Sequence, residues 1–247
     1  MRYFIKFSFL GTNYHGFQCQ PNAITVQQEI NNALSILFNT NIEITGASRT
    51  DAGVHAKEMY AHFDIQDSFN IDKIINNLNG ILPKDIAVSD IFKVHKDINS
   101  RFDAISRTYK YYIINNKDVF NSYACILHKN LDVVAMNKAC IYIIGEKDFS
   151  SFSKSKTQTY TNICNVKIAN WEKKKGVLVF TIKSNRFLRN MVRAVVGTLI
   201  KVGEGRIPPE AMKDILLKKD RSYAGQSVPA NALFLTNIEY PKNIRYV

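Results

Sequence analysis

Hydrophobic periodicity changes repeatedly along the 247 residues, and this limits the folds that the chain can adopt. Apolar and polar residues alternate in some segments, as in half-buried strands, and recur at helical spacing in others. The expected strands are 2–9, 41–45, 59–65, 86–94, 108–114, 164–171, 177–184 and 233–240, and the expected helices are 25–38, 71–78, 133–144, 186–202 and one after Pro208-Pro209. Because this order is not a regular β-α-β alternation, we expect an α+β fold.

Two halves are expected from the same pattern, since each contains strands and helices of its own. The boundary falls near 100–106, without a low-complexity linker, so we expect the halves to pack closely with a cleft between them. Within the first half, Thr25 and Gln28 predict a capping box at the start of helix 25–38. Within the second half, "EKKKG" predicts a solvated hairpin turn at Gly176.

The chain is strongly basic, with 33 Lys and Arg against 21 Asp and Glu and a net charge of +12. Such an excess predicts a polyanionic partner, although a basic protein that is soluble by charge alone would look the same. No apolar run approaches the roughly 18 residues of a membrane span, and the first residues do not form a signal peptide. Four scattered cysteines do not suggest a disulfide framework, so we expect a cytoplasmic protein.

Three arginines fall on one stripe of the expected helix 186–202, opposite its apolar face. They are Arg186, Arg189 and Arg193, and no acid four residues away neutralises them. A solvated helix face is the simple explanation. Arg193, however, lies in an otherwise apolar turn, where a guanidinium needs a carboxylate or a phosphate.

Aromatic and basic side chains also share a face of the expected strand 108–114 and the residue before it. Arg107, Tyr109 and Tyr111 stand two residues apart. Tyrosines of this kind can simply pack within a sheet. A ring beside cations can also support an unstacked nucleobase, and the pattern alone does not choose between the two.

The stretch "GASRTDAGVHA", residues 46–56, holds a single acid, Asp51, between Arg49 and His55. "DAG" is ordinary turn chemistry, so Asp51 could be only a turn former. Asp51 and His55 could belong to a hydrolase triad, but the nucleophile of such a triad would be missing. The five histidines have no zinc-ligand spacing, and no glycine-rich phosphate loop is present, so we expect neither a metal nor a cofactor.

This stretch resembles the signature loop of the TruA-type tRNA pseudouridine synthases, and further blocks resemble that family in the same order. They are "FLGTNYHGFQCQPNAITVQ", "RFDAISRTYKYYI", "GEKDFSSF", "NRFLRNMVRAVVGTL" and "PANALFLTNIEYP". The resemblance runs from about residue 3 to 241. Three positions depart from the usual pattern: Phe17 replaces a tryptophan, Ser48 a glycine, and Asn231-Ala232 a segment that often has a glycine. Ser48 raises the question whether the loop needs backbone angles that only glycine adopts.

The resemblance implies a pseudouridine-synthase fold of two similar halves, 1–104 and 105–247, with antiparallel sheets and a central catalytic cleft. It makes Asp51 the essential aspartate, Tyr109 the stacking partner of the target uracil, Arg193 the partner of the aspartate and Arg49 a contact to the displaced nucleotide. Arg186 and Arg189 become candidates for contacts to the RNA backbone. His55 is expected to shape the loop. A homodimer and tRNA as substrate, at uridines 38 to 40 of the anticodon arm, are implied in the same way.

The implied reaction agrees with the residues present. Isomerising uridine breaks the N1–C1′ bond, rotates the uracil and rejoins it through C5, which requires no oxidation and no phosphate transfer. Asp51 could attack C1′ or remove a proton from C2′, and the Tyr109 hydroxyl could accept the C5 proton. Two other functions remain open: an RNA-binding or chaperone protein without catalysis, and a hydrolase that cleaves a glycosidic bond.

Overall fold

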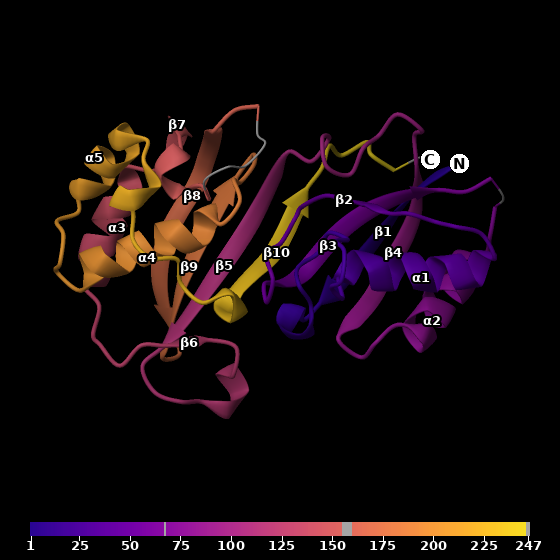
Figure 1. Cartoon of the computed structure of the whole chain (residues 1–247), viewed down its shortest axis with the longest axis horizontal. Helices are drawn as coiled ribbons and strands as arrows, with labels where there is room; N and C mark the ends of the chain where they lie inside the picture. Colours follow the sequence, from indigo (N-terminus) through magenta and orange to yellow (C-terminus); the bar gives the residue numbers. More distant parts are fainter. Residues whose placement is uncertain (67, 155–159, 246–247) are drawn as a thin grey trace. The chain divides into compact units, whose positions relative to one another are not determined.

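The computed structural model describes residues 1–66, 68–154 and 160–245, in two compact units (Figure 1). The first unit comprises Met1–Ile105 together with Leu235–Val247, and the second comprises Ser106–Phe234. The expected second half, 105–247, therefore differs from the second unit at its end. From Leu235 onward the last strand belongs with the first unit, where it lies next to the strand that follows the Asp51 loop.

The first unit holds a mixed arrangement of strands and two helices. Its elements are β1 (Arg2–Phe9), η1 (Gly11–Asn13), α1 (Val26–Phe38), β2 (Thr45–Gly46), β3 (His55–Asp64), α2 (Ile71–Ile81), β4 (Ile86–Val94) and β10 (Leu233–Glu239). The strand order is β4-β1-β3-β10, and β2 pairs with β3. β1 lies antiparallel to both β3 and β4. Figure 1 shows α1 and α2 side by side in this unit.

Helix α1 begins where the sequence predicts, but its capping box is only half formed. The Thr25 side chain accepts a hydrogen bond from the Gln28 backbone N–H, at 3.4 Å. The Gln28 side chain does not turn back to the cap; its Nε2 donates to Asn32, at 2.8 Å. The expected strand 41–45 is wrong except for its last residue, because most of this segment is irregular.

Strand β1 is buried on both faces near its start, whereas the sequence pattern predicts one buried face. Tyr3, Ile5 and Phe7 are buried as expected, and Phe4 is fully buried as well. Phe4 packs in a second cluster with Phe92, Val94 and Ile244. The C-terminal segment therefore covers part of the face that was expected to meet solvent.

The strand order in the second unit is β5-β9-β8-β7, and β6 pairs in parallel with β5. Its elements are β5 (Ser106–Ile114), η2 (Val119–Asn121), β6 (Cys125–Ile126), α3 (Val133–Ile141), β7 (Gly145–Asp148), η3 (Ser150–Phe152), β8 (Ile163–Lys174), β9 (Val177–Ser184), α4 (Met191–Gly203), α5 (Ala211–Lys218), η4 (Arg221–Tyr223) and η5 (Ala230–Ala232). Lys175 and Gly176 both have positive φ, 48° and 82°, which suits a two-residue hairpin turn and confirms the turn expected there. The α+β class is confirmed.

Helix α4 forms the centre of the second unit. Ten of its 13 residues are buried, which is more than the one apolar face that its sequence suggests. It packs against α3, which also contacts β8. A helix buried on most sides is fixed in place by its surroundings, so a side chain that it carries is presented in a defined position.

Candidate active site

Asp51 lies in the loop between β2 and β3, with Arg49 exposed, Thr50 buried and Asp51 half-buried. Backbone hydrogen bonds hold this loop on both sides of the acid. The Thr50 carbonyl accepts from the Phe17 N–H at 3.2 Å, and the Asp51 carbonyl accepts from the Val54 N–H at 3.1 Å. The peptide units around Asp51 are thus tied to the segment after β1 and to the loop itself.

Glycines allow the segment after β1 to approach the Asp51 loop closely. Gly16 has a φ of +94°, and a Cβ atom there would lie 2.7 Å from the Thr50 carbonyl oxygen. At Gly11, a Cβ atom would lie 2.1 Å from the Val54 carbonyl oxygen. Both positions therefore require glycine, and the loop is held against its neighbour by direct contact between backbones.

His55 is fully buried at the end of the loop, where β3 begins. Its Nδ1 accepts a hydrogen bond from the Gly11 N–H, at 2.9 Å. An accepting Nδ1 carries no proton, so in this arrangement the imidazole is neutral. This contact agrees with the expectation that His55 shapes the loop.

Phe17 and Ser48, the two departures from the family pattern that lie nearest the loop, have structural explanations. The Phe17 side chain is 2% exposed and packs on Gly46, where a Cβ atom would lie 2.2 Å from the Phe17 ring. Ser48 is not among the described residues with positive φ. The loop therefore needs no glycine at Ser48, which answers the question that the sequence raised.

Tyr109 lies on β5 and shares its buried face with Arg107 and Tyr111, as the spacing predicts. The Phe187 ring meets the Tyr109 ring edge-on, with centroids 5.1 Å apart and an interplanar angle of 86°. A guanidinium nitrogen of Arg107 donates to the Asn185 carbonyl, at 2.9 Å. Sequence reasoning missed Phe187, whose only signal is an aromatic residue beside Arg186.

Arg193 lies on α4 and is half-buried. Its Nε donates to the Val228 carbonyl, at 2.7 Å. Burial raises the pKa of the Tyr111 hydroxyl, and the positive charge of Arg193 acts in the opposite direction. Arg193 therefore lies within electrostatic reach of Tyr111, which is on the same strand as Tyr109.

The expected helix 186–202 is wrong at its start, and the stripe of three arginines does not exist as predicted. Helix α4 begins at Met191, because Asn190 adopts a left-handed conformation with a φ of 66°. Arg186 and Arg189 therefore lie on the preceding loop, half-buried and exposed respectively. Leu188 lies in this loop and is buried like the apolar residues of the helix. The apolar spacing therefore extends beyond the helix and predicts a start that is too early.

Comparison with known proteins places the chain in a family. A family profile described as tRNA pseudouridine synthase matches residues 6–103 and 139–241. The chain belongs to this family. A tRNA pseudouridine synthase A from Parabacteroides distasonis is 48% identical over 98% of this chain and 97% of its own length. The protein of the same name from Bacteroides thetaiotaomicron is 47% identical, over 98% of this chain and 92% of its own length. One from Francisella tularensis is 38% identical, over 97% of this chain and 94% of its own length.

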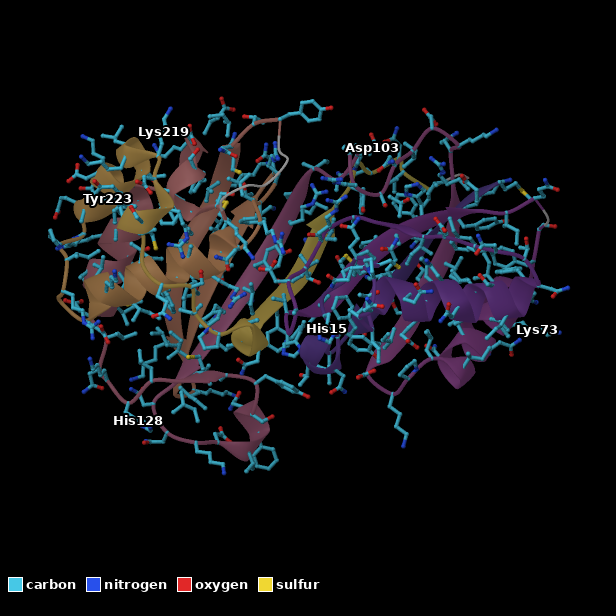
Figure 2. The ribbon with its side chains drawn as sticks, viewed as in Figure 1. His15, Lys73, Asp103, His128, Lys219 and Tyr223 are labelled. Atoms are coloured by element: carbon cyan, nitrogen blue, oxygen red, sulfur yellow. The ribbon has the colours of Figure 1, made fainter. Side chains whose placement is uncertain are left out.

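Within this pseudouridine synthase, the positive charge is distributed very unevenly. The second unit has 22 Lys and Arg against 9 Asp and Glu, so its net charge is 22 − 9 = +13. The first unit has 11 against 12, or 11 − 12 = −1. Figure 2 shows Lys219 among the side chains near α5. The excess of positive charge in the second unit has the sign that attracts a phosphate backbone.

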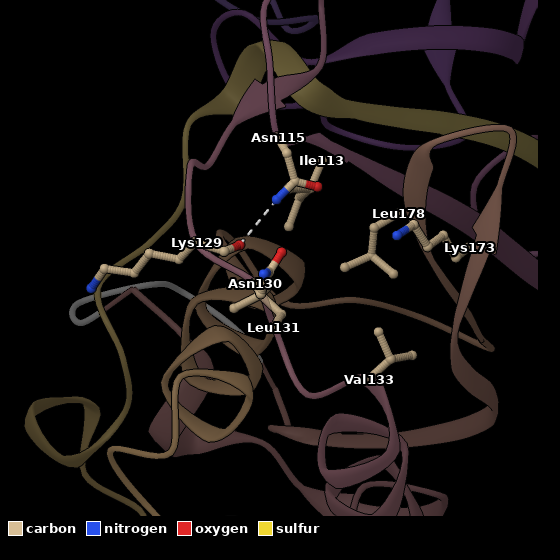
Figure 3. A pocket seen from close by; sticks show the side chains of 8 residues that line it. All are labelled: Ile113, Asn115, Lys129, Asn130, Leu131, Val133, Lys173 and Leu178. Atoms are coloured by element: carbon tan, nitrogen blue, oxygen red, sulfur yellow. Dashed lines mark hydrogen bonds between the residues drawn. The ribbon is translucent and has the colours of Figure 1, made fainter.

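Figure 3 shows a hollow in the second unit. It is lined by Ile113, Asn115, Lys129, Asn130, Leu131, Val133, Lys173 and Leu178, and its volume is about 60 Å³. The Lys129 ammonium is paired with Glu204, at 3.2 Å. None of the predicted site residues of the synthase lines this hollow.

Two further features are absent from the described parts of the synthase. No group of three or more metal-ligating side chains is present there. Nor do those parts contain a helix of the length and hydropathy that crossing a membrane requires.

Proposed function

We propose that this protein isomerises uridine to pseudouridine in the anticodon arm of tRNA, at positions 38, 39 and 40. The observation that carries the proposal is the family match over most of the chain, together with an Asp51 loop that backbone contacts hold in a defined shape. The relatives named above are called tRNA pseudouridine synthase A, which supports tRNA as the substrate.

Asp51 is the essential catalytic residue in this proposal. The reaction breaks the N1–C1′ bond and forms a C5–C1′ bond, and the C5 proton leaves. A single carboxylate is sufficient because it acts on the ribose and is regenerated. Attack on C1′ would give a covalent sugar intermediate, whereas removal of the C2′ proton would give a glycal, and both routes start from the ionised acid.

Tyr109 and Arg193 assist this reaction in two different ways. The target nucleotide must leave the RNA stack, and Tyr109 offers it a replacement stacking surface, worth roughly 1–3 kcal/mol. The edge-on contact from Phe187 supports this role by fixing the plane of the Tyr109 ring. Arg193 pairs with Asp51, as the resemblance to the family implies.

The remaining arginines bind the RNA itself. Arg49 is exposed in the catalytic loop and contacts the displaced nucleotide. Arg186 and Arg189 bind backbone phosphates from the loop before α4, where the second unit supplies the positive charge. The protein acts as a homodimer in the cytoplasm, as the resemblance to the family implies. Neither a cofactor nor a metal takes part.

A product analysis tests this proposal. Purified protein is incubated with a tRNA transcript that contains uridine at 38, 39 and 40, and the RNA is then mapped for pseudouridine at each position. We expect pseudouridine at these positions and no free uracil. Free uracil with an abasic tRNA would instead identify a hydrolase. Tight binding without either product would identify a non-catalytic RNA-binding protein.

A further inference from the structure

The segment Ala224–Val228, called the strap below, lies against helix α4 at distances that only glycine permits. A Cβ atom at Gly197 of α4 would lie 1.8 Å from the Gln226 carbonyl oxygen. A Cβ atom at Gly225 of the strap would lie 2.6 Å from the Gly197 carbonyl carbon. The two backbones are therefore in direct contact, and neither glycine can be replaced without a shift.

Thr198 joins the strap to the helix through both hydrogen-bonding functions of its hydroxyl. The Thr198 side chain is fully buried. Its Oγ1 accepts from the Gly225 N–H at 2.7 Å and donates to the Ala194 carbonyl at 2.8 Å. A buried hydroxyl that is satisfied in this way fixes the distance between the strap and the helix.

The end of the strap reaches Arg193, one turn before Gly197 on the same helix. The Val228 N–H donates to the Arg193 carbonyl at 3.3 Å, and the Arg193 Nε donates to the Val228 carbonyl at 2.7 Å. Ser227 secures this end, since its Oγ accepts from Asn190 at 2.6 Å and from Arg221 at 3.0 Å. Residues 190 to 198 of the helix are thus linked to the strap at both ends.

A guanidinium can bind a carboxylate along two edges. One edge uses Nε and a terminal nitrogen, and the other uses both terminal nitrogens. Because Nε donates to the Val228 carbonyl of the strap, a carboxylate that binds Arg193 along one edge does so through the two terminal nitrogens. The direction in which Arg193 can meet an acid is therefore determined by the position of Val228.

We propose that Thr198 is a positioning residue for the isomerisation, because through the strap it fixes the orientation in which the Arg193 guanidinium can bind a carboxylate. This inference rests on the role proposed above for Arg193. A pre-oriented arginine meets Asp51 without a search among rotamers, and small misplacements of such a group are costly in rate. Binding of tRNA, in contrast, draws on the whole basic unit and does not require this orientation.

Two substitutions at Thr198 test the proposal. Thr198→Val keeps the shape of the side chain and removes the hydroxyl, whereas Thr198→Ser keeps the hydroxyl. We expect Thr198→Val to lower kcat roughly ten- to hundred-fold, as for a misplaced catalytic group, with the Kd for tRNA changed less than about two-fold. Thr198→Ser should restore most of the rate. Thr181→Val, on β9 and half-buried, is the control and should match the unchanged protein.

The orientation of Arg193 can be read without activity, from the Nε–H resonance of this side chain in nitrogen-15 spectra. We expect slow exchange of this proton with water in the unchanged protein and in Thr198→Ser, and fast exchange in Thr198→Val. If Thr198→Val does not fold, Thr198→Ala, which also lacks the hydroxyl, takes its place.

Three outcomes would overturn the proposal: an unchanged kcat in Thr198→Val, a loss of tRNA affinity as large as the loss of kcat, or equal defects in the valine and serine variants. If the unchanged protein makes no pseudouridine, the proposed function fails instead. The Nε–H measurement then still decides whether Thr198 positions Arg193.

Discussion

Single buried side chains determine the shape of the first unit around the Asp51 loop. Phe17 is an example, because its ring fills the space above Gly46 and stacks on Phe7 with centroids 6.2 Å apart. Its backbone N–H also binds the Thr50 carbonyl beside Asp51. The same residue therefore contributes to the core and to the position of the acid, although it departs from the tryptophan usual in the family.

Replacing Phe17 should lower the stability of the protein. Phe17→Ala removes a ring that is 2% exposed, and we expect the free energy of unfolding to fall by about 3–5 kcal/mol. Phe102→Ala is the matched control, since that ring is 77% exposed and its loss should change stability by less than about 0.5 kcal/mol. Denaturant unfolding of both variants checks this, and equal effects would contradict the packing described here.

His62 makes the stability of the first unit depend on pH. Its Nδ1 accepts from the Ser100 N–H at 3.2 Å, and the Ser100 Oγ donates to the Thr45 carbonyl at 2.6 Å. Burial lowers the pKa of His62 below its usual value, and the charge of Arg2 lowers the pKa further, while Asp64 raises it. The folded protein therefore favours the neutral imidazole.

Because the unfolded chain binds the His62 proton more tightly, with a pKa of about 6.5, acid favours unfolding. The contribution of His62 is fully present above pH 6.5 and is lost as the pH falls toward the lower pKa of the folded state. We expect the free energy of unfolding to decrease between pH 7.5 and 5, and to decrease less in His62→Gln. Parallel pH profiles for the two proteins would show that His62 is not responsible.

Most secondary-structure elements could be predicted from sequence, and the errors have local physical causes. α1, β4, β5 and β9 follow from apolar spacing, since each has one face that is consistently buried. The start of α4 could not be predicted, because the left-handed Asn190 depends on contacts with Ser227, far along the chain. The strand expected at 41–45 has the right residue types, but only Thr45 pairs with β3.

The start of α1 can be tested because its N-cap is buried and well defined. Thr25→Ala removes the oxygen that accepts from the Gln28 N–H, so we expect a loss of about 1 kcal/mol in the free energy of unfolding. Thr40→Ala, at an exposed position after the same helix, should have little effect. Thermal unfolding compares the two. A loss of the same size in both would mean that the capping contact does not contribute.

At the scale of the whole molecule, charge and chemistry are divided between the two units. The second unit has a net charge of +13 and the first −1, while the single acid of the signature loop belongs to the first. The total charge could be read from composition, but its division could not, because the unit boundaries place the last strand with the first unit.

Salt dependence should distinguish the two units. We expect the affinity for tRNA to fall steeply with salt, and each lost phosphate contact should reduce the slope of log K against log salt by about 0.7–0.9. Arg189→Ala, in the second unit, should show such a reduction. Lys73→Ala, on α2 of the first unit and labelled in Figure 2, should not. Equal slopes for both variants would contradict the assignment of RNA binding to the second unit.

The residues of the candidate site could be named from the sequence only through resemblance to a family. Composition and spacing left Asp51 as a possible turn former and Tyr109 as a possible packing residue. The contacts that support them could not be predicted, because Phe187 follows another strand and Val228 lies at the end of the strap. Such contacts join residues that are distant in sequence.

The central claim is that Asp51 performs the isomerisation, and the most direct test is release of tritium from tRNA labelled at C5 of uridine. The unchanged protein should release tritium, because the C5 proton leaves when the new bond forms. Asp51→Asn should release none, while its affinity for tRNA stays within several-fold of the unchanged protein. Tritium release by Asp51→Asn at an undiminished rate would contradict this account.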